Sequence, residues 1–351
     1  MKKGVKILIY QIKSTGFIRQ LTSTITVMLG LMLSTGCDST STAQAPENSN
    51  IQTINIGRLI CGGHLPLAIV EKQYQEDLKS FRLNTVQNHD WNDVIADMKS
   101  GKLAGTFILS PLAMNLIREG FPGKIVLISD RNGNGFVLSS KLKSIDDLKS
   151  RKSIIAVPHI YSQHHVLLHM ILKKHNIPDE MVKILGMPPR DMINSMRNGE
   201  IDGFVVGEPE GNKSISLGIG WMAMISPEIW PDHMDHVFMA SDNFIKKHPE
   251  KLQELINQLV RGGEFIEENP GKAAIMGEDY TGSSAPIFEK VLTTPPNWIS
   301  YTNMVADESD MRLMSQKLVD MKLWSDVPID ITRNYFDMSF VNSAKQKVAS
   351  R

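Results

Sequence analysis

The stretch Gly199–Pro209, GEIDGFVVGEP, reads as the end of a helix, a turn, a buried strand and then an acidic residue before a proline. A second copy of this pattern lies upstream. DVIADMKSGKLAGTFILSP (Asp93–Pro111) overlays DMINSMRNGEIDGFVVGEP (Asp191–Pro209) without a gap, at a constant shift of 98 residues. An unpaired charge is costly to bury, so Glu208 marks a point where an apolar strand leaves the core. The repeat predicts two similar α/β units in one chain.

Composition restricts the function classes. The chain has 351 residues, of which 42% are hydrophobic and 22% charged, and this predicts a soluble globular protein of two domains. Lys plus Arg and Asp plus Glu both total 38, so no global field attracts nucleic acid, and we expect no nucleic-acid partner. Cys37 and Cys61 are the only cysteines, which excludes a disulfide framework or a cysteine-rich zinc site.

The N-terminus is typical of a secretion signal over residues 1–36. Basic residues precede an uncharged stretch of 13 residues, Leu21–Leu33, which is shorter than the ~20 residues that span a bilayer. Leu33–Cys37, LSTGC, resembles a bacterial lipobox, in which the cysteine is lipidated and becomes the first mature residue, although the leucine lies one place further from the cysteine than usual. Asp38 resembles the inner-membrane retention signal of lipoproteins.

Residues 37–50 have no apolar periodicity and are predicted to form a tether. We therefore expect a lipid anchor on Cys37 that holds the protein at the extracytoplasmic (periplasmic) side of the cell membrane. The alternative is a secreted protein with a free Cys37 thiol.

From Ile51 onward, strand patterns and helix patterns alternate. Strands are expected at 54–57, 81–86, 106–109 and 124–129, with helices at 64–75, 90–100 and from 110. After residues 131–140 the cycle begins again, with strands at 154–157, 182–185 and 204–206 and helices at 162–175 and from 191. At a shift of 100 residues, Ile54 falls on Ile154 and His64 on His164. This alternation predicts parallel sheets with crossover helices.

The C-terminal part contains too few strands for a third sheet. It offers a strand at His236–Ser241 and a long helix with Pro249 in its first turn. We expect these segments to return to the first unit. The predicted fold is therefore α/β, with two doubly wound lobes joined by crossing segments near Asn132–Leu138 and Val237–Ser241. Lobe 1 is predicted to comprise residues 51–138 with 238–351, and lobe 2 residues 139–237.

Candidate ligand residues lie at strand ends and helix starts, because open α/β sheets bind ligands beyond the carboxyl ends of their strands. Two facing lobes would form a cleft there, and helix N-termini can bind a small oxyanion without any lysine. The candidate residues are Gly63, His64, Trp91, Ser110, Asn134, His159, Tyr161, Ser162 and Glu208.

Several candidates also have a purely structural interpretation. Trp91 could stack on a ligand or cover the core, and Tyr161 and Ser162 could cap a helix. Glu208 could be a helix cap or form an ion pair. Asn132–Gly135 could be a simple hairpin turn rather than a crossing segment.

A family resemblance combines these features. The element order, the NGNG segment at Asn132–Gly135, LSP after the first repeat, GEP after the second, and the helix HPEKL…EFIEENP resemble the nitrate/sulfonate/bicarbonate group of ABC-importer substrate-binding proteins, over Ile51–Asn269. The resemblance implies a periplasmic binding protein type II fold and a monomer without cofactor. It also implies that a small solute is captured between the lobes, unaltered, and delivered to a membrane permease with its ATPase.

The same resemblance places the pocket glutamate of the family on Glu208 and the turn after the first strand on Gly62–His64. The sequence departs from the nitrate and bicarbonate members at this first turn and at Ser110, where their specificity is set. The solute is thus expected to be an anion of the nitrate, sulfonate or bicarbonate kind or a small organic compound.

Three other functions were weighed. His159, His164, His165 and His169 are close in sequence, and His165 and His169 stand one helical turn apart, so a metal-binding lipoprotein is an alternative. A sensor domain of the same fold that no longer takes part in transport is another. The sequence contains no GxSxG, P-loop or GxGxxG motif, and we expect no enzymatic activity.

Overall fold

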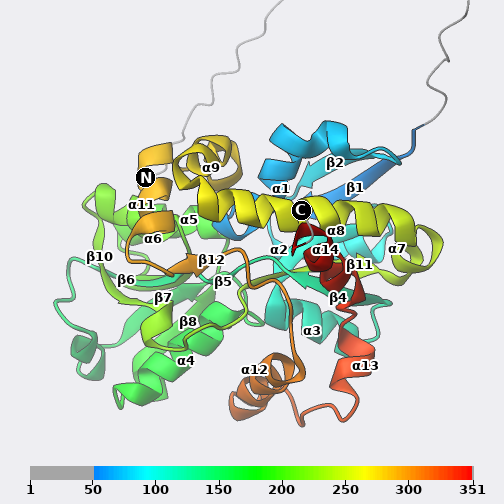
Figure 1. Cartoon of the computed structure of the whole chain (residues 1–351). Helices are drawn as coiled ribbons and strands as arrows, with labels where there is room; N and C mark the ends of the chain where they lie inside the picture. Colours follow the sequence, from blue (N-terminus) through cyan, green and yellow to red (C-terminus); the bar gives the residue numbers. More distant parts are fainter. Residues whose placement is uncertain (1–50, 350–351) are drawn as a thin grey trace, which may run out of the picture. The chain divides into compact units, whose positions relative to one another are not determined.

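The computed structural model describes residues 51–349, which form two five-stranded sheets. The strand orders are β2-β1-β3-β11-β4 and β10-β6-β9-β7-β8 (Figure 1). Two separate mixed sheets with helices between their strands confirm the predicted α/β class. The predicted signal segment, the tether and Cys37 lie outside the described residues.

The first sheet combines parallel and antiparallel strands. β1 (Thr53–Arg58) runs parallel to β2 (Arg82–Gln87) and to β3 (Gly105–Leu109). β11 (His236–Ser241) lies antiparallel between β3 and β4 (Gly123–Ile128). β11 thus belongs to the first sheet, which is mixed and not purely parallel.

The second sheet repeats the topology of the first. β7 (Ser153–Val157) is parallel to β8 (Val182–Gly186) and β9 (Gly203–Gly207), as β1 is to β2 and β3. β6 (Asn134–Ser139) lies antiparallel between β9 and β10 (Gly220–Ile225), in the place that β11 has in the first sheet. β10 was not predicted, because its mostly half-buried residues show no alternation of apolar and polar side chains.

The chain passes between the sheets at residues 129–133 and 226–235, slightly upstream of the predicted crossing segments. Asn132 and Gly133 both have positive φ, at 62° and 73°, so the chain turns there and β6 starts directly afterwards, within the second sheet. The short strand β5 (Arg131–Asn132) pairs instead with β12 (Ile299–Ser300). The exact division into two lobes stays a prediction.

Helices connect the strands. α2 (Trp91–Lys99), α3 (Ser110–Arg118), α4 (Gln163–Lys174) and α5 (Pro189–Asn198) form where helices are predicted, and α6 (Glu210–Ser216) is a further helix that was not predicted. The helix expected at 64–75 is divided into a 3₁₀ turn at Gly62–His64, α1 (Leu65–Ile69), a π turn at Val70–Tyr74 and a 3₁₀ turn at Gln75–Asp77.

Helices of the C-terminal part cover the first sheet. After α7 (Asp242–Lys247), the long α8 (Pro249–Glu268) buries its apolar stripe, including Leu252, Leu255 and Leu259, and packs against α1 and α14 (Figure 1). The remaining helices are α9 (Pro270–Met276), α10 (Glu278–Thr281), α11 (Ala285–Thr293), α12 (Glu308–Asp320), α13 (Ile331–Tyr335) and α14 (Ser339–Ala349).

A buried arginine attaches the first crossing segment to this C-terminal part. The Arg131 guanidinium donates to both carboxylate oxygens of Asp310, at 2.9 and 2.7 Å, and to the backbone carbonyl oxygens of Asp232, Asn303 and Val305. A bidentate arginine–carboxylate pair fixes orientation as well as distance. The chain between the two sheets is therefore held to α12.

Candidate ligand site

The carboxyl ends of strands from both sheets surround one small cavity. From the first sheet side it is lined by Leu59, Ile60, Cys61, Trp91, His236 and Thr281, and from the second by Pro158, Pro189 and Val206–Glu210. Its volume of about 20 Å³ accommodates roughly one water molecule. This is the place where open α/β sheets bind ligands.

The two sides approach each other closely at Gly62. A Cβ atom at this position would lie 2.2 Å from the backbone carbonyl oxygen of Glu208. Only glycine therefore permits this contact between the turn after β1 and the end of β9. Other bonds link the two sides, including Lys213 Nζ to the Gly282 carbonyl at 2.8 Å and Tyr161 Oη to the Leu323 carbonyl at 3.4 Å.

Glu208 lies at this contact, but its carboxylate is turned toward α6. Oε2 accepts hydrogen bonds from the backbone N–H of Asn212 at 2.9 Å and from its side-chain amide at 3.2 Å. Oε1 is buried without a hydrogen-bond partner among the described residues, close to Gly135 and Gly211. Burial raises the pKa of Glu208 to about 7. The acid at the end of the strand is thus a helix cap whose remaining oxygen is unsatisfied.

A cluster of polar side chains, of which Cys61 is half-buried and the histidines are buried, borders the cavity on the first-sheet side. Cys61 Sγ lies 3.4 Å from Nε2 of His236, and the imidazole ring of His236 lies edge-on to that of His64 with 5.0 Å between centroids. The indole of Trp91 stacks on His236 at 6.0 Å. His64 and His236 are almost completely buried, so their polar ring nitrogens lie in the interior of the protein.

Two buried carboxylates stand behind His236. Its Nδ1 lies 3.3 Å from Asp130 Oδ1 and 3.1 Å from Asp235 Oδ2. Both distances allow an ion pair, but neither contact has the geometry of a hydrogen bond. Burial and the charge of Asp235 together raise the pKa of Asp130 to about 7. Burial alone would lower the pKa of His236, but Asp235, Cys61 and Asp130 raise it well above its ordinary value. Burial, followed by the charge of His236, lowers the pKa of His64.

Several predicted site residues come together here. Trp91 and Glu208 line the cavity, and His64 belongs to the adjoining cluster. Gly63 allows the close approach of His236, because a Cβ at Gly63 would lie 2.2 Å from Nδ1 of His236. The indole N–H of Trp91 is buried without an acceptor among the described residues, so it is available to a ligand.

Other predicted site residues have partners within the protein. Ser110 Oγ donates to the Met234 carbonyl at 3.2 Å, and Asn134 Nδ2 donates to the Asn132 carbonyl at 2.8 Å. Ser162 caps α4 by accepting from the backbone N–H of His165. None of these three lines the cavity.

The predicted histidine cluster does not converge on one point. His159 accepts from the backbone N–H of Tyr161 and stacks on that ring, and neither lines the cavity. His165 bonds through Nδ1 to the Ile160 carbonyl at 2.8 Å. Among the described residues, the groups of three or more metal-ligating side chains include no histidine of the His159–His169 run.

Four residues of this cluster are not among the predicted site residues, namely Cys61, Asp130, Asp235 and His236. In the sequence, Cys61 bears only on the cysteine count, and His236 is the first residue of a predicted strand. The sequence does contain a signal for them, because a charged residue at the end of an apolar strand also singled out Glu208. Asp130 directly follows an apolar strand and Asp235-His236 directly precedes one, so charged groups mark the points where the chain crosses between sheets.

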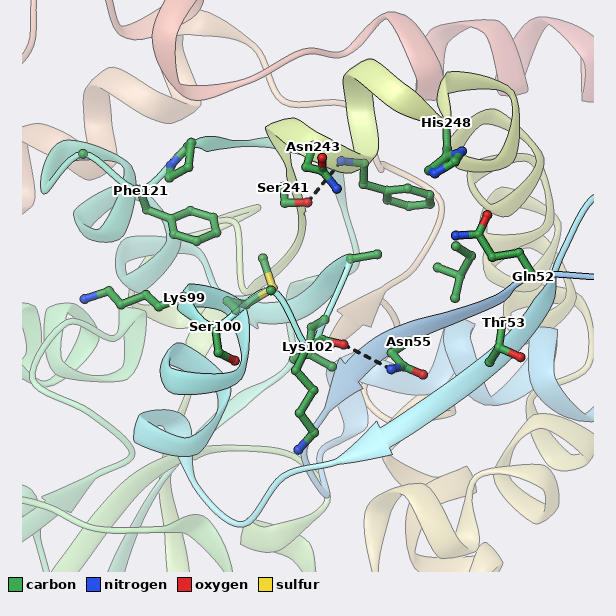
Figure 2. A pocket seen from close by; sticks show the side chains of 18 of the residues that line it. Gln52, Thr53, Asn55, Lys99, Ser100, Lys102, Phe121, Ser241, Asn243 and His248 are labelled. Carbon is green, nitrogen blue, oxygen red and sulfur yellow. Dashed lines mark hydrogen bonds between the residues drawn. The ribbon is translucent and has the colours of Figure 1, made fainter.

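A larger hollow of about 690 Å³ lies at the opposite edge of the first sheet (Figure 2). It is lined by the amino ends of β1 and β3 and by polar side chains such as Asn55, Lys99 and Lys102. Asn55 Nδ2 donates to the Lys102 carbonyl at 3.1 Å, and none of the lining residues has a buried polar atom without a partner. The unsatisfied groups single out the small cavity as the candidate ligand site.

Two sheets of equal topology whose strand ends surround one cavity define a periplasmic binding protein fold, and solved structures agree. A ligand-binding component of an ABC-type import system from Staphylococcus aureus, with zinc bound, superposes with a TM-score of 0.76 at 21% identity over 84% of this chain and 99% of that one. The nitrate-binding protein NrtA from Synechocystis PCC 6803 gives 0.73 at 17% identity over 86% and 90%.

The chain belongs to the NMT1-like family, whose model matches residues 47–278. Among curated proteins, the nitrate import ATP-binding protein NrtC of Synechocystis is 24% identical over 69% of this chain and 40% of its own length. The chain thus spans well under half of this relative. A desulfurization enzyme, DszB, shares the fold with a TM-score of 0.62 at 12% identity, covering 85% of this chain and 99% of that one. No helix within residues 51–349 is both long and apolar enough to cross a membrane.

Proposed function

We propose that this chain is the extracytoplasmic substrate-binding component of an ABC importer. It would capture a small solute between its two α/β halves and deliver it to a permease driven by an ATPase. The observation that carries the proposal is the cavity that strand ends of both sheets line, with unsatisfied polar atoms around it. Curated relatives named as nitrate and bicarbonate import proteins support it.

The proposed solute is a small anion of the nitrate, bicarbonate or sulfonate kind, or a small organic compound. Trp91 lines the cavity, and its indole N–H has no acceptor among the described residues. Burial raises the pKa of Glu208 to about 7, so near neutral pH a large fraction of this carboxyl is protonated and the cavity wall carries little negative charge there. A neutral donor such as the indole N–H can bind an oxyanion without a lysine or arginine. Because the cavity is small in this conformation, a larger solute requires the halves to separate by hinge motion.

A thermal-shift screen followed by calorimetry tests this proposal. Nitrate, bicarbonate, alkanesulfonates, taurine and thiamine-type pyrimidines would be added to chelator-treated protein. We expect Trp91→Phe, which keeps the ring and removes the N–H, to weaken binding at least about tenfold, or ~1.4 kcal/mol. Trp221→Phe is the matched control, since the Trp221 indole donates to the Leu142 carbonyl in the second sheet. Equal affinity of both variants would reject the proposed role of Trp91.

We further propose that Cys37 is lipidated and holds the protein at the periplasmic side of the cell membrane. The support is the lipobox-like LSTGC sequence that ends at Cys37. Acyl-chain labelling in cells should mark the parent chain and leave a Cys37→Ala variant unmarked. Unchanged electrophoretic migration of the variant, together with absent labelling of the parent, would show a secreted protein with a free thiol.

A further inference from the structure

We propose that Cys61, His64 and His236 form a binding site for one zinc-like transition-metal ion. The thiolate of Cys61 and one ring nitrogen from each histidine would be the protein ligands. This site goes beyond the proposed uptake of a solute, and it does not depend on it. The following observations concern only the residues that the structure describes.

The distances fit a tetrahedral ion. The three side chains place their possible ligand atoms within 4.8 Å of one another, and Cys61 Sγ lies 3.4 Å from His236 Nε2. Zinc bonds of ~2.3 Å to sulfur and ~2.0 Å to nitrogen at tetrahedral angles separate a sulfur from a nitrogen ligand by roughly 3.5 Å. The thiol and the imidazole therefore already stand at the spacing that a shared ion requires.

The Nδ1 atom of each histidine lies next to oxygen atoms of the protein. Nδ1 of His64 lies 3.1 Å from the Leu59 carbonyl oxygen, and its Nε2 is buried without a hydrogen-bond partner. Nδ1 of His236 faces the carboxylates of Asp130 and Asp235, which leaves Nε2 toward Cys61. Metal-binding histidines commonly direct their other nitrogen to a carbonyl or carboxylate, which fixes the ring and its tautomer. His64 Nδ1 lies 3.1 Å from both the carbonyl oxygen and the backbone nitrogen of Leu59, and His236 Nδ1 lies beside two carboxylates, so oxygen acceptors of both kinds are at hand.

The local sequence Cys61-Gly-Gly-His64 makes the arrangement possible. Gly62–His64 is a 3₁₀ turn, and positions i and i+3 of such a turn lie on the same side. The glycines are required because a Cβ at Gly63 would lie 2.2 Å from His236 Nδ1, and one at Gly62 would lie 2.2 Å from the Glu208 carbonyl oxygen. The chain therefore presents Cys61 and His64 together and admits His236 between them.

The donor set also selects the class of ion. One thiolate and two imidazoles suit Zn²⁺ or Cu⁺ and disfavour the oxygen-seeking ions Mg²⁺ and Ca²⁺. Three protein ligands leave one tetrahedral position open. Cys61 and His236 also line the adjoining cavity of about 20 Å³, which has room for one water-sized ligand.

The first experiment uses Co²⁺ as a spectroscopic probe for Zn²⁺, in a Cys37→Ser background so that Cys61 is the only cysteine. We expect one equivalent of Co²⁺ to produce a sulfur-to-cobalt charge-transfer band together with the strong visible bands of four-coordinate cobalt. Zn²⁺ should displace it stoichiometrically. Cys61→Ser should abolish the charge-transfer band, and His236→Gln should weaken binding at least about tenfold. Asp235→Asn should weaken it by about 10- to 100-fold, as expected for a group that orients a ligand.

His165→Gln is the matched control, because His165 lies on α4 and bonds to the Ile160 carbonyl. Its Co²⁺ spectrum and affinity should equal those of the parent. If a cluster variant fails to fold, the alkylation rate of Cys61 is measured instead in the Cys37→Ser protein, whose cluster is intact. One equivalent of Zn²⁺ should slow the alkylation of that thiol. An absent charge-transfer band, or a thiol that alkylates equally fast with and without Zn²⁺, would overturn the site. Solute binding is measured in chelator, so failure of either proposal leaves the other measurable.

Discussion

Glu208→Gln should make the protein more stable, and the gain should depend on pH in a defined way. In the folded chain, burial raises the pKa of Glu208 from an ordinary 4.5 to about 7. Below pH 4.5 the carboxyl is protonated in both the folded and the unfolded chain, so its ionisation costs nothing. Between 4.5 and 7 the unfolded chain has released the proton and the folded chain still holds it. Folding stability is therefore lost over this window as pH rises, and the loss levels off above pH 7.

The size of this effect follows from the shift. A difference of about 2.5 units at ~1.4 kcal/mol per unit gives a loss of about 3 kcal/mol by pH 8. Glutamine carries no proton to release and keeps a carbonyl oxygen to accept from the backbone N–H of Asn212. The stability of Glu208→Gln relative to the parent should consequently rise by about 3 kcal/mol from pH 4 to pH 8, most of it between pH 5 and 7.

Urea unfolding of both proteins at pH 4, 5, 6, 7 and 8 measures this stability difference. The other titrating groups are the same in both proteins, so their contributions cancel. Asn212→Ala is a useful companion, because it removes the side-chain donor at 3.2 Å and should raise the pKa of Glu208 further. A stability difference between Glu208→Gln and the parent that is constant over the five pH values would refute the reasoning. It would mean that the carboxylate is solvated and that the cavity wall is not as the structure describes it.

Two further substitutions test the contact between the halves and the anchoring of the crossing segment. Gly62→Ala should keep the halves apart, because its Cβ would lie 2.2 Å from the Glu208 carbonyl oxygen. Small-angle scattering should then show a larger radius of gyration. Gly186→Ala is the control, because open space surrounds its Cβ, and its radius should match that of the parent. Equal radii for both variants would contradict the contact. Arg131→Ala should destabilise the fold by about 3–5 kcal/mol, because it leaves the largely buried Asp310 carboxylate without its partner. A urea midpoint equal to that of the parent would contradict this.

Much of the fold was predictable because the alternation of strands and helices follows local patterns. The two gapless copies correspond to α2 with β3 and α5 with β9, and the shared topology of the sheets explains why the chain repeats. The edge strand β10 was missed because it packs only partly and shows no alternation. The crossing point was placed a few residues late, because left-handed backbone at Asn132 ends the crossing before the apolar stretch that sequence analysis assigned to it.

The candidate site was less predictable, because spacing along the chain does not indicate which strand ends face one another. Trp91, Glu208 and His64 are predicted because each stands at a strand end or helix start, and the structure places them at or beside the cavity. His236 and Asp130 were missed, because they come together only when β11 inserts between β3 and β4. The sequence suggests a metal site only at the run His159–His169, whereas among the described residues it is Cys61 and His64 that converge with His236.

The two copies of the internal repeat contribute different side chains near the cavity. His64 and His164 occupy corresponding places, and both are buried with an unsatisfied Nε2, yet His64 has Cys61 and His236 beside it while His164 faces Gly207. All three proposed metal ligands belong to the first sheet and the turn after β1. The proposed metal site would therefore belong to the first sheet alone. The second sheet contributes the Glu208 carbonyl oxygen that lies against Gly62.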